Sequence, residues 1–230
     1  MSDLMKVGPD WGGTGTFKPF TSGISGAQRA QNAHAQYMDA TLAGRVFSTG
    51  TAAGLSISNV SFTLATTGAT ATPIIGVWNP ASSPVNLVIW QAMLAPYMTT
   101  LTGTVGPGGF VWMVSTGQSA TLTLAVTPYN RRTLVAAGSY ARGLNGAALT
   151  GFSGTLATMC TSTLNGGSGM TTAFTETAVG ARAPNLTSVE FIDGSIVVPP
   201  GGVLALMASV TPVGHTALSG LVWEEVPILP

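Results

Sequence analysis

The chain has 230 residues, and only 7% of them are charged, against the roughly 25% that is usual in soluble proteins. Eight basic and eight acidic side chains cancel to a formal net charge of zero, which argues against direct recognition of nucleic acid or of an anionic membrane. A single cysteine, Cys160, excludes an internal disulfide, so packing must hold the fold together. Because a protein without net charge tends to associate, we expect an assembly to be its working state.

The first 23 residues are rich in glycine and carry three aromatic residues without a regular period, Trp11, Phe17 and Phe20. We interpret this stretch as an extended arm whose aromatic side chains bind a partner surface; the alternative is that they fold back on their own domain. No apolar run precedes Pro9, so we expect no secretory signal peptide. The apolar stretch 84–98 is shorter than the roughly 18 residues that a membrane helix needs, and we expect no membrane partner.

Sustained helix formers occur only in the next stretch, from Ser25 to Phe47. Ser25 can cap a helix, small or aromatic residues recur at a spacing of three or four, and Gly44 can end it. We therefore predict one short helix here. Residues 1–47 form the arm and the helix in this interpretation, and residues 48–230 form one β domain.

From residue 48 onward, segments rich in Val, Ile, Thr, Leu and aromatic residues alternate with clusters of Gly, Pro and Ser. We predict roughly ten strands, at 55–64, 72–80, 85–94, 109–114, 120–128, 172–180, 186–194, 195–200, 201–210 and 216–227. Turn dipeptides, among them Asp193-Gly194, are expected where the chain reverses. The segment 133–170 is poor in large side chains, and we expect it to be a surface excursion with short strands. The pattern predicts an all-β fold, an antiparallel β-sandwich or jelly roll.

The stretch "SIVVPPGGVLALMASV" at 195–210 has a clear interpretation. One strand ends at Pro199, the chain turns through Pro200 to Gly202, and a nearly continuous apolar strand follows from Val203 to Val210. A strand without alternation is buried on both faces. We therefore expect it either in the core or at a seam between subunits.

Three segments together carry a resemblance to a known class of proteins: "AHAQYMDATLAGRVFS" at 33–48, "LVIWQAML" at 87–94 and "IVVPPGGVLALMASV" at 196–210, followed by a last strand with Trp223. The chain resembles the jelly-roll virion proteins of tailed bacteriophages, of the head-decoration or cement class. The resemblance implies a homotrimer on the outside of a capsid lattice, an arm that reaches neighbouring subunits, no catalysis, and assembly in the host cytoplasm.

Groups for catalysis are scarce, since the chain has eight carboxylates and two histidines. Glu190 and Asp193 could form a glycosidase pair, but a turn and strand-end role is the stronger interpretation. Glu224 and Glu225 point to opposite faces of a regular strand and do not pair. We predict no enzyme, and expect no catalytic residue, cofactor, metal ion or small-molecule substrate; two histidines and Cys160 have no zinc-binding spacing.

Arg131 and Arg132, which follow Tyr129 and Asn130, are the only adjacent basic residues. They are candidates for gripping an acidic groove or a sugar on a partner, although solvated turn residues are the simpler interpretation. Of five tryptophans, four lie in predicted strands, which favours core packing over sugar binding. The virion subunit is the leading hypothesis; the alternative is a carbohydrate- or receptor-binding β-sandwich, such as an adhesin or a phage tail or fibre module.

Overall fold

A computed structural model describes residues 37–51, 55–56, 65–67, 73–98, 110–118, 122, 127–144, 152, 155–164, 187–208 and 215–228. The chain divides into two compact units, Met1–Asp39 and Ala40–Pro230, and the fold described below belongs to the second apart from the first two residues of the helix. The predicted arm with Trp11, Phe17 and Phe20, and the predicted start of the helix at Ser25, lie outside the described residues.

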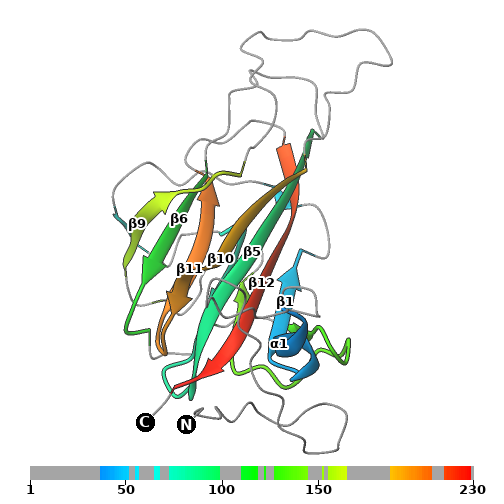
Figure 1. The fold of residues 1–230 in the computed structure, drawn as a ribbon. Coiled ribbons are helices and arrows are strands. Elements are labelled where there is room, and N and C mark those ends of the chain that lie inside the picture. The colour runs from blue at the N-terminus through cyan, green and yellow to red at the C-terminus, as the bar shows by residue number, and fades with distance from the viewer. Residues whose placement is uncertain are drawn as a thin grey trace, which may run out of the picture. The chain divides into compact units, whose positions relative to one another are not determined.

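Two antiparallel sheets of six strands each make up the fold (Figure 1). The first has the order β10-β5-β12-β1-β7, with β2 also paired to β12, and the second has the order β3-β9-β6-β11-β4-β8. The first sheet contains β1 (Val46–Gly50), β2 (Leu55–Ser56), β5 (Val85–Met98), β7 (Tyr129–Asn130), β10 (Ser188–Val198) and β12 (His215–Pro227), and the second contains β3 (Ala65–Thr67), β4 (Ile75–Trp78), β6 (Phe110–Ser115), β8 (Arg142–Leu144), β9 (Thr155–Thr161) and β11 (Val203–Ala208). The predicted all-β sandwich is confirmed.

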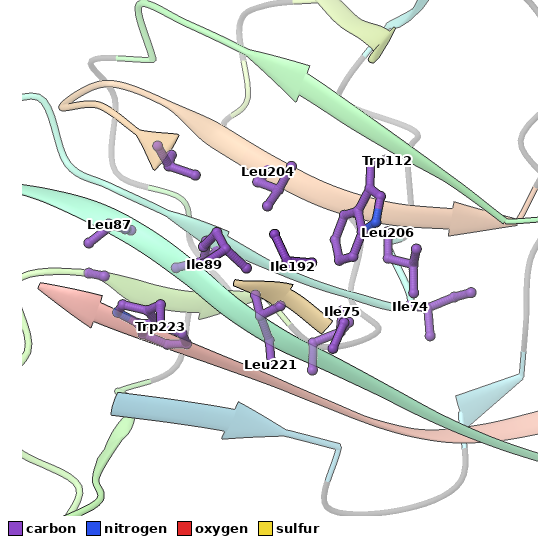
Figure 2. Packing of buried hydrophobic residues seen from close by; sticks show 14 of the residues in the cluster. Ile74, Ile75, Leu87, Ile89, Trp112, Ile192, Leu204, Leu206, Leu221 and Trp223 are labelled. Carbon is purple, nitrogen blue, oxygen red and sulfur yellow. The ribbon is translucent and has the colours of Figure 1, made fainter. Parts of the chain in front are cut away.

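The main core lies between the two sheets. Trp112, Leu204 and Leu206 from the second sheet belong to one buried cluster with Ile89 and Trp223 from the first (Figure 2). Burying a large apolar side chain contributes roughly 1.5–3 kcal/mol, so this layer dominates the stability of the fold.

A second apolar cluster covers the other face of the second sheet, where Val203, Ala205 and Met207 pack with Phe152 and other buried side chains. Strand β11 contributes to both clusters, and each of its six residues is buried. The prediction that this strand is buried on both faces is confirmed, and it is a core strand of the chain's own fold. The expectation that 133–170 is a surface excursion is wrong for part of this segment, because Phe152, Leu156 and Leu164 are buried.

The helix is α1 (Met38–Leu42), and Gly44 lies just after its end as predicted. Tyr37, which the sequence pattern placed in the helix, is not helical and has a φ of +69°, so that part of the prediction is wrong. Gly44 has a φ of +75° and its N–H donates to the carbonyl of Thr41, which is the geometry of a helix terminus with a left-handed residue. The chain then enters β1 at Val46, earlier than the sequence indicated, and the side chain of Phe47 joins the main core.

The expected reversal at Asp193-Gly194 is wrong. Residues 188–198 form a single strand, β10, and its pairing with β5 shifts register between Phe191 and Ile196. Asp193 and Gly194 have φ values of +47° and +81°. The dipeptide that favours a turn therefore makes a β-bulge, because positive φ can also add residues to one strand without reversing it.

The turn that follows β10 carries the chain from the first sheet to the second. Gly201 adopts a φ of +76°, and Gly202 donates to the carbonyl of Pro199. Asn79, which is fully buried, holds this turn: it exchanges backbone hydrogen bonds with Gly201 and Gly202, and its side chain donates to the carbonyl of Val198. The predicted turn is confirmed. It joins the two sheets because the strands that flank it, β10 and β11, lie in different sheets.

Candidate functional site: an exposed, internally braced loop

The most distinctive surface feature of the described chain is the segment Tyr129–Ala141, which we call the 129–141 loop. It leaves β7 at the edge of the first sheet and enters β8 at the edge of the second. Because both flanking strands are edge strands, the loop closes one side of the sandwich.

Asn130 organises the first half of the loop. Its side-chain oxygen accepts hydrogen bonds from the backbone N–H groups of Arg132 and Thr133, at 2.9 and 3.2 Å, and its amide donates to the carbonyl of Gly44 at 2.7 Å. The backbone of Asn130 also exchanges hydrogen bonds with Leu134 and Val135. An asparagine at the start of a turn commonly makes such bonds, and here they fix the chain on both sides of Arg131 and Arg132.

Glu225 of β12 fixes the other end of the loop. Its side chain is buried, and its Oε1 accepts hydrogen bonds from Ser139 Oγ at 2.6 Å and from the N–H groups of Tyr140 and Ala141 at 3.1 and 3.3 Å. Arg142 donates through one Nη to the carbonyls of Ser139 and Ala141. Charged acceptors and donors make the stronger hydrogen bonds, so the loop is held in one conformation at both ends.

This braced loop presents apolar side chains to solvent. Leu134 is 77% exposed, and Tyr129, Val135 and Tyr140 are each more than half exposed. Leu134 also has a φ of +60°. A left-handed conformation costs a non-glycine residue of order 1–3 kcal/mol, and an exposed leucine recovers little of that cost by burial. An exposed, strained apolar residue on an ordered loop is therefore a candidate for contact with a partner.

Arg131 and Arg132, the predicted partner-binding pair, are exposed on the same loop. The loop contains no acidic residue, so it is a positive feature on a chain of zero net charge. Sequence reasoning missed Leu134, Val135 and Tyr140, which lie in a segment that was expected only to be a surface excursion. The signal that could have found Leu134 and Val135 is a pair of large aliphatic residues beside "NRR" in a stretch of small residues.

A second exposed apolar surface lies on the outer face of the first sheet, along the edge strand β10. Val189, Phe191 and Val197 are 40%, 70% and 50% exposed. Val189 and Val197 are paired in register with half-buried Met93 and Val88 of β5, so the apolar surface extends across two strands. We call these five residues the β10 surface.

Glu190, the first residue of the candidate glycosidase pair, makes hydrogen bonds within the fold. Glu190 Oε2 accepts from Trp112 Nε1 at 3.0 Å and from Ser162 Oγ at 2.6 Å, and Oε1 accepts from the N–H of Thr163, so this carboxylate ties β10 to the other sheet. Asp193 lies in the β-bulge of β10. The expectation that Glu190 is a solvated strand-end residue is thus wrong, because its side chain is on the inward face.

Glu224 and Glu225 lie on opposite faces of β12, as predicted. Glu224 pairs with Arg45 on the outside, with Arg45 Nη2 at 2.9 Å from Glu224 Oε1, whereas Glu225 holds the loop from within. The described residues contain no cluster of three or more His, Cys, Asp or Glu side chains that could hold a metal ion. Burial, and then the nearby Glu190 carboxylate, raise the pKa of the Cys160 thiol above its ordinary value.

Four tryptophans confirm the prediction of core packing, since Trp78, Trp90, Trp112 and Trp223 are all buried.

Among the described residues, no helix combines the length and the hydropathy needed to cross a membrane. The chain has no significant match to a protein-family model, to a curated protein or to a solved structure.

Proposed function

We propose that the chain is a non-catalytic structural subunit of a virus particle, a capsid decoration or cement protein that assembles in the host cytoplasm. In this proposal it binds a capsid lattice as a homo-oligomer, with a trimer as the expected form. The 129–141 loop is the observation that carries the proposal. It offers exposed apolar and arginine side chains on a backbone that is already held by hydrogen bonds, so little backbone entropy is lost when a partner binds.

Two further features support an assembly. The chain carries no net charge, and the β10 surface is a second apolar area on a sheet edge. Edge strands with exposed apolar side chains are prone to associate with other chains. On a lattice, each weak contact is multiplied by the number of copies, so modest surfaces are sufficient for stable attachment.

The proposal is tested in two steps. Light scattering on a gel-filtration column, at low and at high salt, gives the native mass of the full-length chain, and we expect a salt-insensitive oligomer because the exposed surfaces are mainly apolar. Particles purified by density gradient from the culture that produces the chain are then analysed by quantitative mass spectrometry. We expect the chain at a copy number comparable to that of the major capsid protein; a monomer that is absent from particles contradicts the proposal.

A second candidate function is a carbohydrate- or receptor-binding sandwich. The observation that favours it is the exposure of two tyrosines, Tyr129 and Tyr140, on the loop that carries Arg131 and Arg132. Exposed aromatic rings supply flat surfaces with a polar end, and the arginines can bind acidic sugars. A glycan array distinguishes the two functions: this candidate requires a defined glycan whose binding is lost on Tyr129→Ala or Tyr140→Ala.

A further inference from the structure

We infer that the 129–141 loop recognises a segment of another protein in which carboxylates accompany apolar side chains, and that the described part of a second copy of the chain does not supply this segment. The inference rests on the proposed function in taking the loop as the binding surface, and it adds the chemistry of the partner. Charge, side-chain type and the occupancy of the chain's own carboxylates each support it.

The charge of the loop determines the charge of its partner. Arg131 and Arg132 are exposed and adjacent, and no acidic residue lies between Tyr129 and Ala141. The nearest carboxylate bound to the loop is Glu225, whose Oε1 already accepts from Ser139, Tyr140 and Ala141. Arginine pairs well with carboxylates through paired N–H donors, so an acidic partner complements the loop.

The apolar side chains favour a protein over an acidic polysaccharide. Leu134 and Val135 are the neighbouring aliphatic residues of the loop, and both are more than half exposed. Aliphatic side chains gain from contact with other apolar side chains and offer no aromatic face for a sugar ring. Tyrosine and arginine, which flank them in the loop, are the residue types that most often dominate protein interfaces.

The described part of a second copy is a poor source of the carboxylates. The three described glutamates are engaged within the chain: Glu190 with Trp112 and Ser162, Glu224 with Arg45, and Glu225 with the loop itself. The described aspartates, Asp39 and Asp193, lie in different elements, α1 and β10. Asp193 is a single carboxylate beside the β10 surface, so the described part of a second copy presents no group of several carboxylates beside an apolar patch.

The experiment is a selection from a display library of short random peptides, with the immobilised full-length chain as bait. We expect the selected peptides to be enriched in Asp and Glu together with Leu, Ile, Phe or Tyr, relative to the starting library. One selected peptide is then synthesised with a fluorescent label, and its affinity for variants is measured by fluorescence anisotropy.

Arg131→Ala with Arg132→Ala should weaken binding about tenfold, and Leu134→Ala about fivefold, because both remove contacts at the centre of the surface. The matched control is Ala81→Glu with Ser82→Glu, in an exposed turn closed by the hydrogen bond from Ser83 to Pro80. It changes the net charge by the same two units as the arginine variant, and we expect an affinity within about twofold of the wild type. Circular dichroism and thermal unfolding verify that each variant is folded.

Three results overturn the inference. The first is a library that returns no binding peptide, or peptides without acidic enrichment. The second is a control variant that weakens binding as much as the arginine variant. The third is a glycan array that shows binding of an acidic polysaccharide that depends on Arg131 and Arg132. Failure of the proposed function is seen separately, in the native mass and in the particle composition. If the chain binds peptides that combine acidic and apolar residues but is absent from particles, the virion function is refuted and this inference stands.

Discussion

Two adjacent glutamates on β12 provide an internal comparison of a buried carboxylate with a partly exposed one, since the Glu224 side chain is 15% exposed. Glu225 is buried and its Oε1 accepts three hydrogen bonds from Ser139, Tyr140 and Ala141. Glu224 points outward, and its partner Arg45 has a side chain that is 46% exposed. We predict that Glu225→Ala destabilises the fold much more than Glu224→Ala.

The magnitude follows from the hydrogen bonds that each carboxylate makes. A hydrogen bond to a charged group contributes about 1.5–3 kcal/mol, but water can reach Tyr140, which is half exposed, after the side chain is removed. We therefore expect Glu225→Ala to lower the free energy of unfolding by about 2–4 kcal/mol. An ion pair at the surface contributes at most about 1 kcal/mol, and the Arg45 side of this pair is open to water, so Glu224→Ala should cost about 1 kcal/mol.

The assay is urea unfolding followed by circular dichroism, with the slope against denaturant compared between the variants. Hydrogen exchange at the N–H groups of Tyr140 and Ala141 gives a local readout, and we expect faster exchange only in Glu225→Ala. Equal destabilisation by the two variants, or unchanged exchange in the loop, would refute the conclusion that Glu225 fixes the 129–141 loop.

Three other predictions follow from single positions. Leu134→Gly should be more stable than Leu134→Ala by about 1 kcal/mol in urea unfolding, because glycine adopts a φ of +60° without strain; the reverse order would contradict the left-handed conformation. Cys160 should react with iodoacetamide more slowly in the folded chain than in urea at the same mildly alkaline pH, because its raised pKa lowers the fraction of thiolate. Glu190→Gln should speed the reaction of the folded chain, because it removes a nearby negative charge. Equal rates in the folded and the unfolded chain would refute the raised pKa. Gly76→Ala should cost about 2 kcal/mol or more in thermal unfolding, because an added Cβ would lie 2.4 Å from the carbonyl oxygen of Leu204 on the paired strand; a neutral effect would show that β4 and β11 are further apart.

The sequence predicted the fold class because strand patterns are local. Alternation of apolar and polar residues, and the unbroken apolar run that became β11, depend only on neighbours in the chain. Gly44 and the turn from Pro199 to Gly202 were also predicted, since positive φ angles favour glycine wherever they occur. Asp193-Gly194 was misread as a reversal because the same dipeptide fits a turn and a bulge, and only the partner strand β5 decides between them.

The candidate site was only half visible in the sequence. Arg131 and Arg132 stood out as the one adjacent basic pair, whereas Leu134, Val135 and Tyr140 were not singled out, because the surface excursion predicted for 133–170 did not show which of its side chains stay exposed. Exposure depends on what covers a side chain, and covering residues come from distant parts of the chain. The proposed roles of Trp11, Phe17 and Phe20 stay predictions, since these residues lie outside the described part.

The sequence by itself thus determined the low charge, the lack of an internal disulfide, the β-rich architecture and the strand that is buried on both faces. Tertiary structure alone decided the roles of the glutamates, because Glu190 meets Trp112 across 78 positions and Glu225 meets Ser139 across 86. A carboxylate has the same local pattern whether it is solvated, catalytic or holding a loop. Which of these it becomes is decided by the donors that the folded chain brings within hydrogen-bonding distance.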